Sequence, residues 1–302
     1  MLAFQSLTIL NLTLTTPLDF NYAECLRFLN RNEDECLHRV VSEEVFSSVC
    51  FGGKVIPFSV KYCDNGFHIE TINDLNQQAL NALQLHIEEW FDLKRDLSPF
   101  YKLLEANERL TPLLQLKGLR IMGIPNLFEA LCWSVIDQQI NLNFAFKLKR
   151  RLVETYGVKT SIQDQVIWQF PTPESLLTID EAFQKGNQFS RSKVAYIRNL
   201  GEAFATGKIS KQILTSLNTF EERQTLLTSV KGIGEWSANY ALMKCMHEPN
   251  AIPFGDTGLT QALFNLGLIT DRKNRKQVED FFGNVKGWES YTTFYLWHSL
   301  LS

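Results

Sequence analysis

A short glycine-rich hairpin constrains the fold of this chain more than any other feature. In segment 226–240 an apolar helix is expected to end at Gly232-Ile233-Gly234, and a second amphipathic helix starts at once. Glycine adopts φ > 0 without a Cβ clash and lets another molecule approach the backbone closely. Amides at the start of the second helix carry partial positive charge and suit a phosphate. A plain loop between packed helices remains the alternative for this segment taken alone.

A single carboxylate follows the hairpin. Asp256 lies 22 residues after Gly234, in the run Pro253-Phe254-Gly255-Asp256, and an apolar helix that extends to Leu266 follows it. Aspartate in this place either caps the helix or supplies a charge beside the hairpin. The two roles can coexist, because the helix dipole keeps a carboxylate ionised.

These segments resemble the helix-hairpin-helix (HhH-GPD) DNA glycosylases, and within them the alkyl-base branch, the DNA-3-methyladenine glycosylase II family. The resemblance rests on Leu-x-x-Val-Lys-Gly-Ile-Gly-x-Trp-Ser-Ala-x-Tyr at 227–240 and Pro-Phe-Gly-Asp at 253–256. It covers nearly the whole chain and is strongest over 119–146 and 226–262. It implies that the hairpin grips the DNA backbone and that Asp256 serves the chemistry.

Composition limits the remaining classes. The 302 residues suggest about two domains, and a hydrophobic content of 45% can form a sizeable core. No uninterrupted apolar run approaches the length of a membrane-spanning helix, which needs about 18 residues. The N-terminus lacks the basic region of a signal peptide. The six cysteines form no CxxC and the histidines no HExxH, so we expect no metal site. The cysteines are expected to be buried thiols in a reducing compartment. We therefore expect the protein in the cytoplasm, associated with the nucleoid in a bacterium.

Charge is unevenly distributed. Residues 1–116 hold nine Lys and Arg against 16 Asp and Glu, and residues 117–302 hold 21 against 17. The net charges are therefore −7 and +4, although the whole chain is at −3. We expect a DNA-binding face on the C-terminal part, where only the contacted phosphates need neutralising.

The N-terminal part predicts a small α+β domain over residues 1–95. Strands are expected at 4–14, 45–51, 54–62 and 67–72, because apolar residues alternate there, and Asp64-Asn65-Gly66 is a strong hairpin signal. Helices are expected from Pro17 to Leu29 and from Leu75 to Trp90. The segments 17–20 and 90–93 fall where similar segments fall in the glycosylase family.

A helical connection is expected over 96–118 and the glycosylase core over 119–302. Helices are predicted at 127–137, 144–156, 251–266, 273–285 and 291–301, and others start near Thr172 and Phe189. The fold class is therefore α+β: a small antiparallel-sheet domain, then, from Leu113 onward, an all-α pair of subdomains with a cleft between them.

The resemblance assigns residues to the DNA grip and to a wedge. The backbone amides of Lys231, Gly232, Ile233 and Gly234 would hold the phosphates, and family hairpins often also hold a monovalent cation. Arg191 and Lys193 are candidate phosphate contacts, or simply solvated charges at a helix start. Gln138 and Gln139 lie where the family inserts a side chain into the base stack, with Gln139 at the inserting position; some relatives have Leu there. A polar pair that ends a helix is the alternative.

The base pocket is expected to be aromatic. Trp236 and Tyr240 are four residues apart on one helical face, and Trp297 matches a pocket tryptophan of the family. Each ring alone is also a core candidate, since 12% of the chain is aromatic. Together they would attract a cationic alkylated purine by about 0.5 to 2 kcal/mol each.

The chemistry implied is hydrolysis by one carboxylate. A cationic base leaves readily, so Asp256 would stabilise the oxocarbenium-like sugar and orient or deprotonate the attacking water. Bifunctional relatives have a lysine two residues after the second hairpin glycine, where this chain has Trp236. Iron–sulphur relatives have four clustered cysteines after the aspartate, which are absent here. No cofactor is expected.

Three functions remain open from the sequence. The first is a monofunctional, monomeric glycosylase that flips alkylated purines such as 3-methyladenine and 7-methylguanine out of double-stranded DNA and leaves an abasic site. The second is a non-enzymatic hairpin module that binds DNA. The third is a glycosylase for deaminated or oxidised purines.

Overall fold

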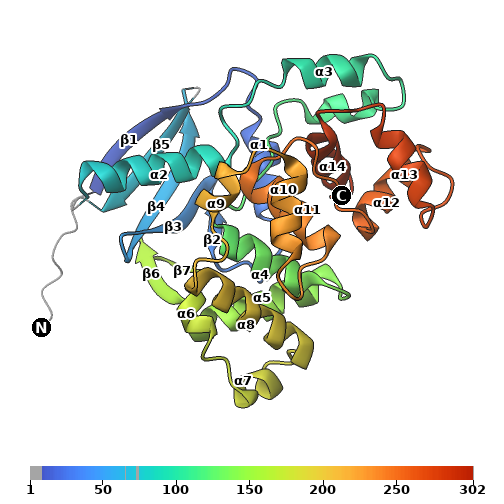
Figure 1. Ribbon diagram of the computed structural model, residues 1–302. Helices are drawn as coiled ribbons and strands as arrows, with labels where there is room; N and C mark the ends of the chain where they lie inside the picture. The colour runs from blue at the N-terminus through green and yellow to red at the C-terminus, as the bar shows by residue number, and fades with distance from the viewer. Residues whose placement is uncertain (1–8, 65, 73–74, 302) are drawn as a thin grey trace, which may run out of the picture.

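An antiparallel sheet forms the N-terminal part of the computed structural model, which describes residues 9–64, 66–72 and 75–301. Its five strands lie in the order β1-β5-β4-β3-β2, with every neighbouring pair antiparallel (Figure 1). The strands are β1 (Ile9–Thr15), β2 (His38–Val41), β3 (Glu44–Phe51), β4 (Lys54–Cys63) and β5 (Gly66–Ile72). The strands predicted from alternation are confirmed. Residues 4–8 of the first strand and Asn65 of the turn lie outside the described residues.

Helices cover this sheet and connect it to the rest of the chain. They are α1 (Tyr22–Leu29), α2 (Gln77–Trp90), α3 (Ser98–Glu105) and the 3-10 helix η1 (Thr111–Leu116). Asn76 caps α2 through its side chain, and the apolar stripe Leu83, Ile87 and Trp90 is buried. Helix α2 therefore lies along the sheet with one face in the core (Figure 1).

The remainder of the chain is mainly helical, as predicted. Its helices are α4 (Leu127–Asp137), α5 (Leu142–Tyr156), α6 (Pro173–Leu176), α7 (Glu181–Gly186), α8 (Arg191–Ala205), α9 (Lys211–Ser216), α10 (Phe220–Thr228), α11 (Glu235–Met246), α12 (Thr257–Asn265), α13 (Arg275–Phe282) and α14 (Glu289–His298). Side-chain caps define many of the starts, among them Thr172 before α6 and Ser190 before α8. No helix among the described residues is long and apolar enough to span a membrane.

The prediction of an all-α region after Leu113 is wrong at one place. A two-stranded hairpin, β6 (Val158–Ile162) and β7 (Gln165–Gln169), interrupts the helices and packs against β3 and β4. The amide of Trp168 donates to the Cys36 carbonyl at 3.0 Å. Ile162 and Ile167 bury Phe46 of the N-terminal sheet. The hairpin thus joins the two parts of the chain across their boundary.

Two aspartates anchor the segments that the family resemblance singled out. The carboxylate of Asp19 forms a salt bridge with the buried guanidinium of Arg120, with Oδ1 2.9 Å from Nη2. Asp92 follows α2 and binds three groups: the ring of His247 at 2.9 Å, the hydroxyl of Tyr291 at 2.6 Å and Arg95 at 3.2 Å. These bonds tie the N-terminal part to the end of α11 and to α14.

Acid should weaken the junction at Asp92. Burial alone would raise the pKa of this carboxyl, but the hydrogen bonds from His247 and Tyr291 and nearby positive charge bring it down to about 2. The folded-state pKa is below the unfolded one, so the contribution is complete above the unfolded pKa and is lost as pH falls through the folded one. We expect the Asp92 share of the unfolding free energy, about 2 kcal/mol, to disappear between about pH 5 and about pH 2.

Denaturant unfolding across this pH range measures that loss. Asp92→Asn should be less stable than wild type at neutral pH and should lose less stability in acid. The exposed Glu108 is the matched control. Glu108→Gln should follow the wild-type curve, and an identical acid slope in Asp92→Asn and wild type would contradict the assignment.

Candidate active site

The Gly232-Ile233-Gly234 hairpin connects α10 and α11 and is fixed from inside. Gly232 has φ +107°, and a Cβ there would lie 2.3 Å from a ring carbon of Tyr196. Ile233 is buried, and its amide donates to the Val230 carbonyl at 3.0 Å. This corrects the prediction for Ile233: its N–H is already used within the turn, and the residue anchors the hairpin through its side chain.

Gly234 is the open position of the hairpin. It is exposed, has extended backbone angles and begins α11, and a Cβ there would meet no atom within 4 Å. In the part of the chain that the structure describes, no side chain caps this helix start. The first-turn amides of α11 therefore remain for an acceptor from outside the protein, which is the geometry of a phosphate site.

The two glycines should respond differently to alanine. Gly232→Ala meets both the unfavourable φ and the Tyr196 ring, so we expect a loss of more than about 1 kcal/mol in unfolding free energy. Gly234→Ala has room within the protein but puts a methyl group where a phosphate would approach. It should keep the melting temperature and weaken DNA binding in a fluorescence titration. Equal melting temperatures for the two variants would contradict this division.

Asp256 stands at the start of α12 with both carboxylate oxygens engaged. Oδ1 accepts from the Leu259 amide at 2.6 Å and from Trp297 Nε1 at 2.8 Å, and Oδ2 accepts from Trp236 Nε1 at 3.3 Å. A Pro253–Gly255 turn, with Gly255 at φ +87°, brings the carboxylate there. The N-cap role and the placement beside the aromatic residues thus occur in the same side chain.

The three predicted pocket residues come together around this carboxylate. The rings of Trp236 and Tyr240 stack with centroids 5.5 Å apart and an interplanar angle of 22°, and Trp297 lies 6.2 Å from Tyr240. Tyr240 is 7% exposed, while both tryptophans are half-buried. Burial raises the pKa of Tyr240, so its hydroxyl stays neutral. Because α11, α12 and α14 carry these residues, the rings and Asp256 form one fixed group.

Sequence reasoning missed Gly258 at this site. A Cβ on Gly258 would lie 3.2 Å from Asp256 Oδ1 and 3.4 Å from the Trp297 ring. The absent side chain therefore leaves room for the indole to reach the carboxylate. The signal was the second glycine in Gly255-Asp256-Thr257-Gly258, which is unfavourable within a helix unless packing requires it.

Gln138 and Gln139 take different roles between α4 and α5. Gln138 Nε2 donates to the Gly232 carbonyl at 3.1 Å and to Ser237 Oγ at 3.0 Å, so this side chain is tied to the hairpin and does not point outward as a wedge. Gln139 is exposed and has φ +59°. A non-glycine residue held in this conformation costs about 1 kcal/mol or more, and such strain is concentrated at functional sites.

Lys193 does not have the predicted role. Its side chain is buried, and Nζ donates to the carbonyls of Val135, Ile136 and Gln138 at 3.0, 2.9 and 2.7 Å. All three ammonium protons therefore satisfy the end of α4, and none is left for a phosphate. Burial lowers the pKa of Lys193, partly opposed by Asp137. Arg191 and Lys231 are exposed and remain candidate phosphate contacts.

Asp256 itself lines neither of two large hollows among the described residues. One of about 950 Å³ adjoins the same loop, with Thr257 and Arg272 in its wall, and one of about 760 Å³ lies between β3, α2 and α9. We therefore place the candidate active site where Asp256 and the three aromatic rings meet, and not in either hollow. A base flipped out of DNA would reach such a site from the open surface and would not need a deep cavity.

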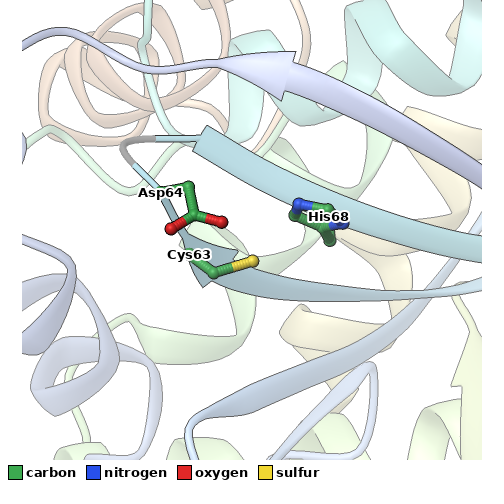
Figure 2. A group of neighbouring side chains, drawn as sticks. All are labelled: Cys63, Asp64 and His68. Atoms are coloured by element: carbon green, nitrogen blue, oxygen red, sulfur yellow. The ribbon is translucent and has the colours of Figure 1, made fainter.

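One cluster of potential metal ligands occurs in the described part of the chain. Cys63, Asp64 and His68 offer donor atoms within 4.8 Å of one another at the β4–β5 hairpin (Figure 2). Asp64 and His68 are exposed, and the set has three donors where a structural zinc site has four. It belongs to the N-terminal sheet and not to the Asp256 group.

Comparisons with known proteins agree with this arrangement. A family model described as HhH-GPD superfamily base excision DNA repair protein matches residues 132–286. The model of the 8-oxoguanine DNA glycosylase N-terminal domain matches residues 11–131. The chain is 32% identical to the DNA-3-methyladenine glycosylase of Bacillus subtilis (strain 168) over 96% of this chain and 97% of that protein. It is 24% identical to DNA-3-methyladenine glycosylase 2 of Escherichia coli (strain K12) over 60% and 61% of the two chains.

Solved structures show the same fold. The 3-methyladenine DNA glycosylase from Archaeoglobus fulgidus superposes with a TM-score of 0.79 at 21% identity over 95% of this chain and 97% of that one. The Clostridium acetobutylicum 8-oxoguanine glycosylase/lyase in its apo form gives 0.72 at 20% identity, with 95% of each chain covered. The family predicted from the hairpin and Asp256 is confirmed: this chain belongs to the HhH-GPD superfamily of base excision DNA repair proteins, in its DNA-3-methyladenine glycosylase branch.

Proposed function

We propose that this protein is a monofunctional DNA glycosylase that hydrolytically releases alkylated purines from double-stranded DNA and leaves an abasic site. One observation carries the proposal: Asp256 is held by two indole N–H groups at the edge of a stacked aromatic group. The Bacillus subtilis relative, which matches almost end to end, is a 3-methyladenine glycosylase by name.

The proposed reaction needs little besides a cation site and one carboxylate. An alkylated purine such as 3-methyladenine or 7-methylguanine carries positive charge, which the electron-rich rings of Trp236, Tyr240 and Trp297 attract. The C1′–N bond breaks with its electron pair going to the base, and the base leaves neutral. Asp256 then faces an oxocarbenium-like sugar, stabilises its charge and orients or deprotonates the water that attacks C1′.

The grip and the wedge complete the proposal. The open amides at Gly234 and the exposed Lys231 and Arg191 would hold phosphates, and such contacts fix register without reading sequence. Gln139 would enter the stack in place of the flipped nucleotide. Its amide can form hydrogen bonds with the orphaned partner base.

Two other functions are less well supported. A non-enzymatic binding module has no need for a carboxylate that receives two indole N–H groups. A lyase that acts on oxidised purines would need an amine to form a Schiff base. Trp236 occupies the position of the lyase lysine and uses its N–H to hold Asp256.

The test is the identity of the released base. Methylated duplex DNA incubated with the protein should release 3-methyladenine and 7-methylguanine, which chromatography identifies, and should keep intact strands until the abasic sites are cleaved by alkali. Borohydride should trap no covalent protein–DNA adduct. Absence of base release would refute the proposal, and a trapped adduct would favour the lyase.

The proposal includes no cofactor, so activity should survive exhaustive treatment with a chelator. A monovalent cation at the hairpin would bind carbonyls that already accept hydrogen bonds. The Gly232 carbonyl accepts one from the side-chain amide of Gln138, and the Lys231 carbonyl accepts one from the side-chain amide of Asn199. The protein would act as a monomer, where chromosomal DNA is found: the cytoplasm, or the nucleoid in a bacterium. Light scattering of the free protein and of its DNA complex tests the monomer.

A further inference from the structure

A second carboxylate lies beside the Asp256 group. Asp137 is the last residue of α4, directly before the Gln138 that is tied to the hairpin. Its side chain is half-buried, and within the described residues its carboxylate forms no hydrogen bond and no ion pair. The reaction proposed above does not use it.

Charged and titratable groups from four elements act electrostatically on Asp137. Asp256 before α12 and Tyr240 on α11 interact with it electrostatically, as do Lys193 on α8 and Arg31 after α1. Neither cation pairs with it. The Lys193 ammonium donates hydrogen bonds to three backbone carbonyls. The Arg31 guanidinium donates to the Phe28 carbonyl and lies 3.8 Å from the centre of the Phe28 ring.

This environment keeps the carboxyl group close to its point of ionisation. Burial and the negative charge of Asp256 raise the pKa of Asp137 to about 6, against the opposing effects of Lys193 and Arg31. At neutral pH the group is mostly an anion, without a partner and next to another anion. A cation that enters between the two carboxylates would relieve both the missing pairing and the repulsion.

The aromatic group places such a cation next to Asp137. Helix α4 packs against α11, and Trp133, one helical turn before Asp137, lines a small cavity together with Tyr240. Tyr240 in turn stacks on Trp236, so the end of α4 that carries Asp137 lies at the ring group proposed to hold the base. A purine held by these rings with its sugar at Asp256 would therefore have its charged ring system close to both carboxylates. A neutral purine would gain no comparable attraction.

We propose that Asp137 is a specificity-determining residue, whose negative charge selects positively charged alkylated purines over neutral ones. This inference rests on the proposed glycosylase function and goes beyond it. It assigns the discrimination between charged and neutral bases to a residue other than the one that serves the sugar.

The pH dependence of kcat/KM tests the assignment. With duplex DNA containing 7-methylguanine, Asp137→Asn should lower kcat/KM about 10- to 100-fold at about pH 8. The ratio of the wild-type kcat/KM to that of the variant should become about ten-fold smaller by about pH 5, because about one tenth of the Asp137 carboxyl groups in the wild type then remain ionised. On DNA containing the neutral base hypoxanthine, the variant should lose no more than about three-fold at either pH.

Matched variants separate this role from a structural one. Glu129 is also a half-buried carboxyl on α4 that interacts electrostatically with Tyr240, and burial raises its pKa to about 7. The charges that act on it are those of Lys149 and Glu35 and not that of Asp256. Glu129→Gln should keep the wild-type pH profile. If Asp137→Asn is poorly folded by its melting temperature, Asp137→Ser replaces it.

Each outcome decides between the two proposals. A wild-type protein that releases no alkylated base refutes the function itself. An active wild type whose Asp137 variants lose the same factor at every pH, or equally on 7-methylguanine and hypoxanthine, refutes the inference and leaves the function standing. Wild-type activity on 7-methylguanine without any on hypoxanthine leaves the pH profile as the deciding measurement.

Discussion

Asp256→Asn should slow base release about 10³-fold while the protein remains folded. Asparagine caps a helix about as well as aspartate, so the bond to the Leu259 amide can be kept. The loss is therefore electrostatic. The amide has no charge to stabilise the sugar cation, and it is too weak a base to take a proton from water.

The geometry adds a second cost. Three N–H groups point at the two oxygens of Asp256, and asparagine offers only one oxygen. Its NH₂ group must face an indole N–H, and Trp236, with the longer bond of 3.3 Å, is the partner expected to be lost.

Single-turnover release of 7-methylguanine, combined with a melting curve, checks both statements about Asp256→Asn. Trp297→Phe is the control. It removes one donor and keeps the charge, so it should cost much less, on the order of ten-fold. Release by Asp256→Asn at the wild-type rate would remove the carboxylate from the mechanism.

The sequence was sufficient for the features that depend on short, regular signals. Alternating apolar residues located β3, β4 and β5, and helical periodicity located α2, α4 and α14 within a few residues. The Gly232–Gly234 hairpin and Asp256 were found because their residue types are required by backbone conformation and charge. The convergence of Trp236, Tyr240 and Trp297 followed from the family pattern.

The two missed hairpins share one physical cause. The turn between β2 and β3 uses Ser42 and Glu43 at φ 49° and 64°, and the turn between β6 and β7 uses Gln163 and Asp164 at 48° and 63°. Both turns need two residues in the left-handed region, for which glycine and asparagine are the usual signal. Neither turn contains them, so packing against the sheet must stabilise a conformation that local sequence disfavours.

The role of Lys193 could not be predicted for a different reason. A cation in the first turn of a helix looks the same in sequence whether it faces solvent or a neighbouring helix end. The distinction depends on how α8 packs against α4, which is a long-range contact. Asp137 was missed for the same reason, because the charged groups that act on it come from distant parts of the chain.

Lys193→Met should destabilise the protein strongly, and Arg191→Ala should not. Methionine fills a similar volume but leaves the carbonyls of Val135, Ile136 and Gln138 without their common donor. Unsatisfied buried acceptors cost about 1 to 3 kcal/mol each, so with partial access of water we expect a loss of about 3 kcal/mol in unfolding free energy. Base release should also fall, because the end of α4 positions Gln139.

Arg191 is the matched control, two residues earlier on the same helix and exposed. Arg191→Ala should keep the melting temperature, weaken DNA binding and reduce the slope of log K against log salt by about one. Lys193→Met should leave that slope unchanged, since the buried ammonium releases no counterion on binding. If instead Lys193→Met reduces the salt slope and keeps its stability, the ammonium contacts a phosphate and the helix-end role is wrong.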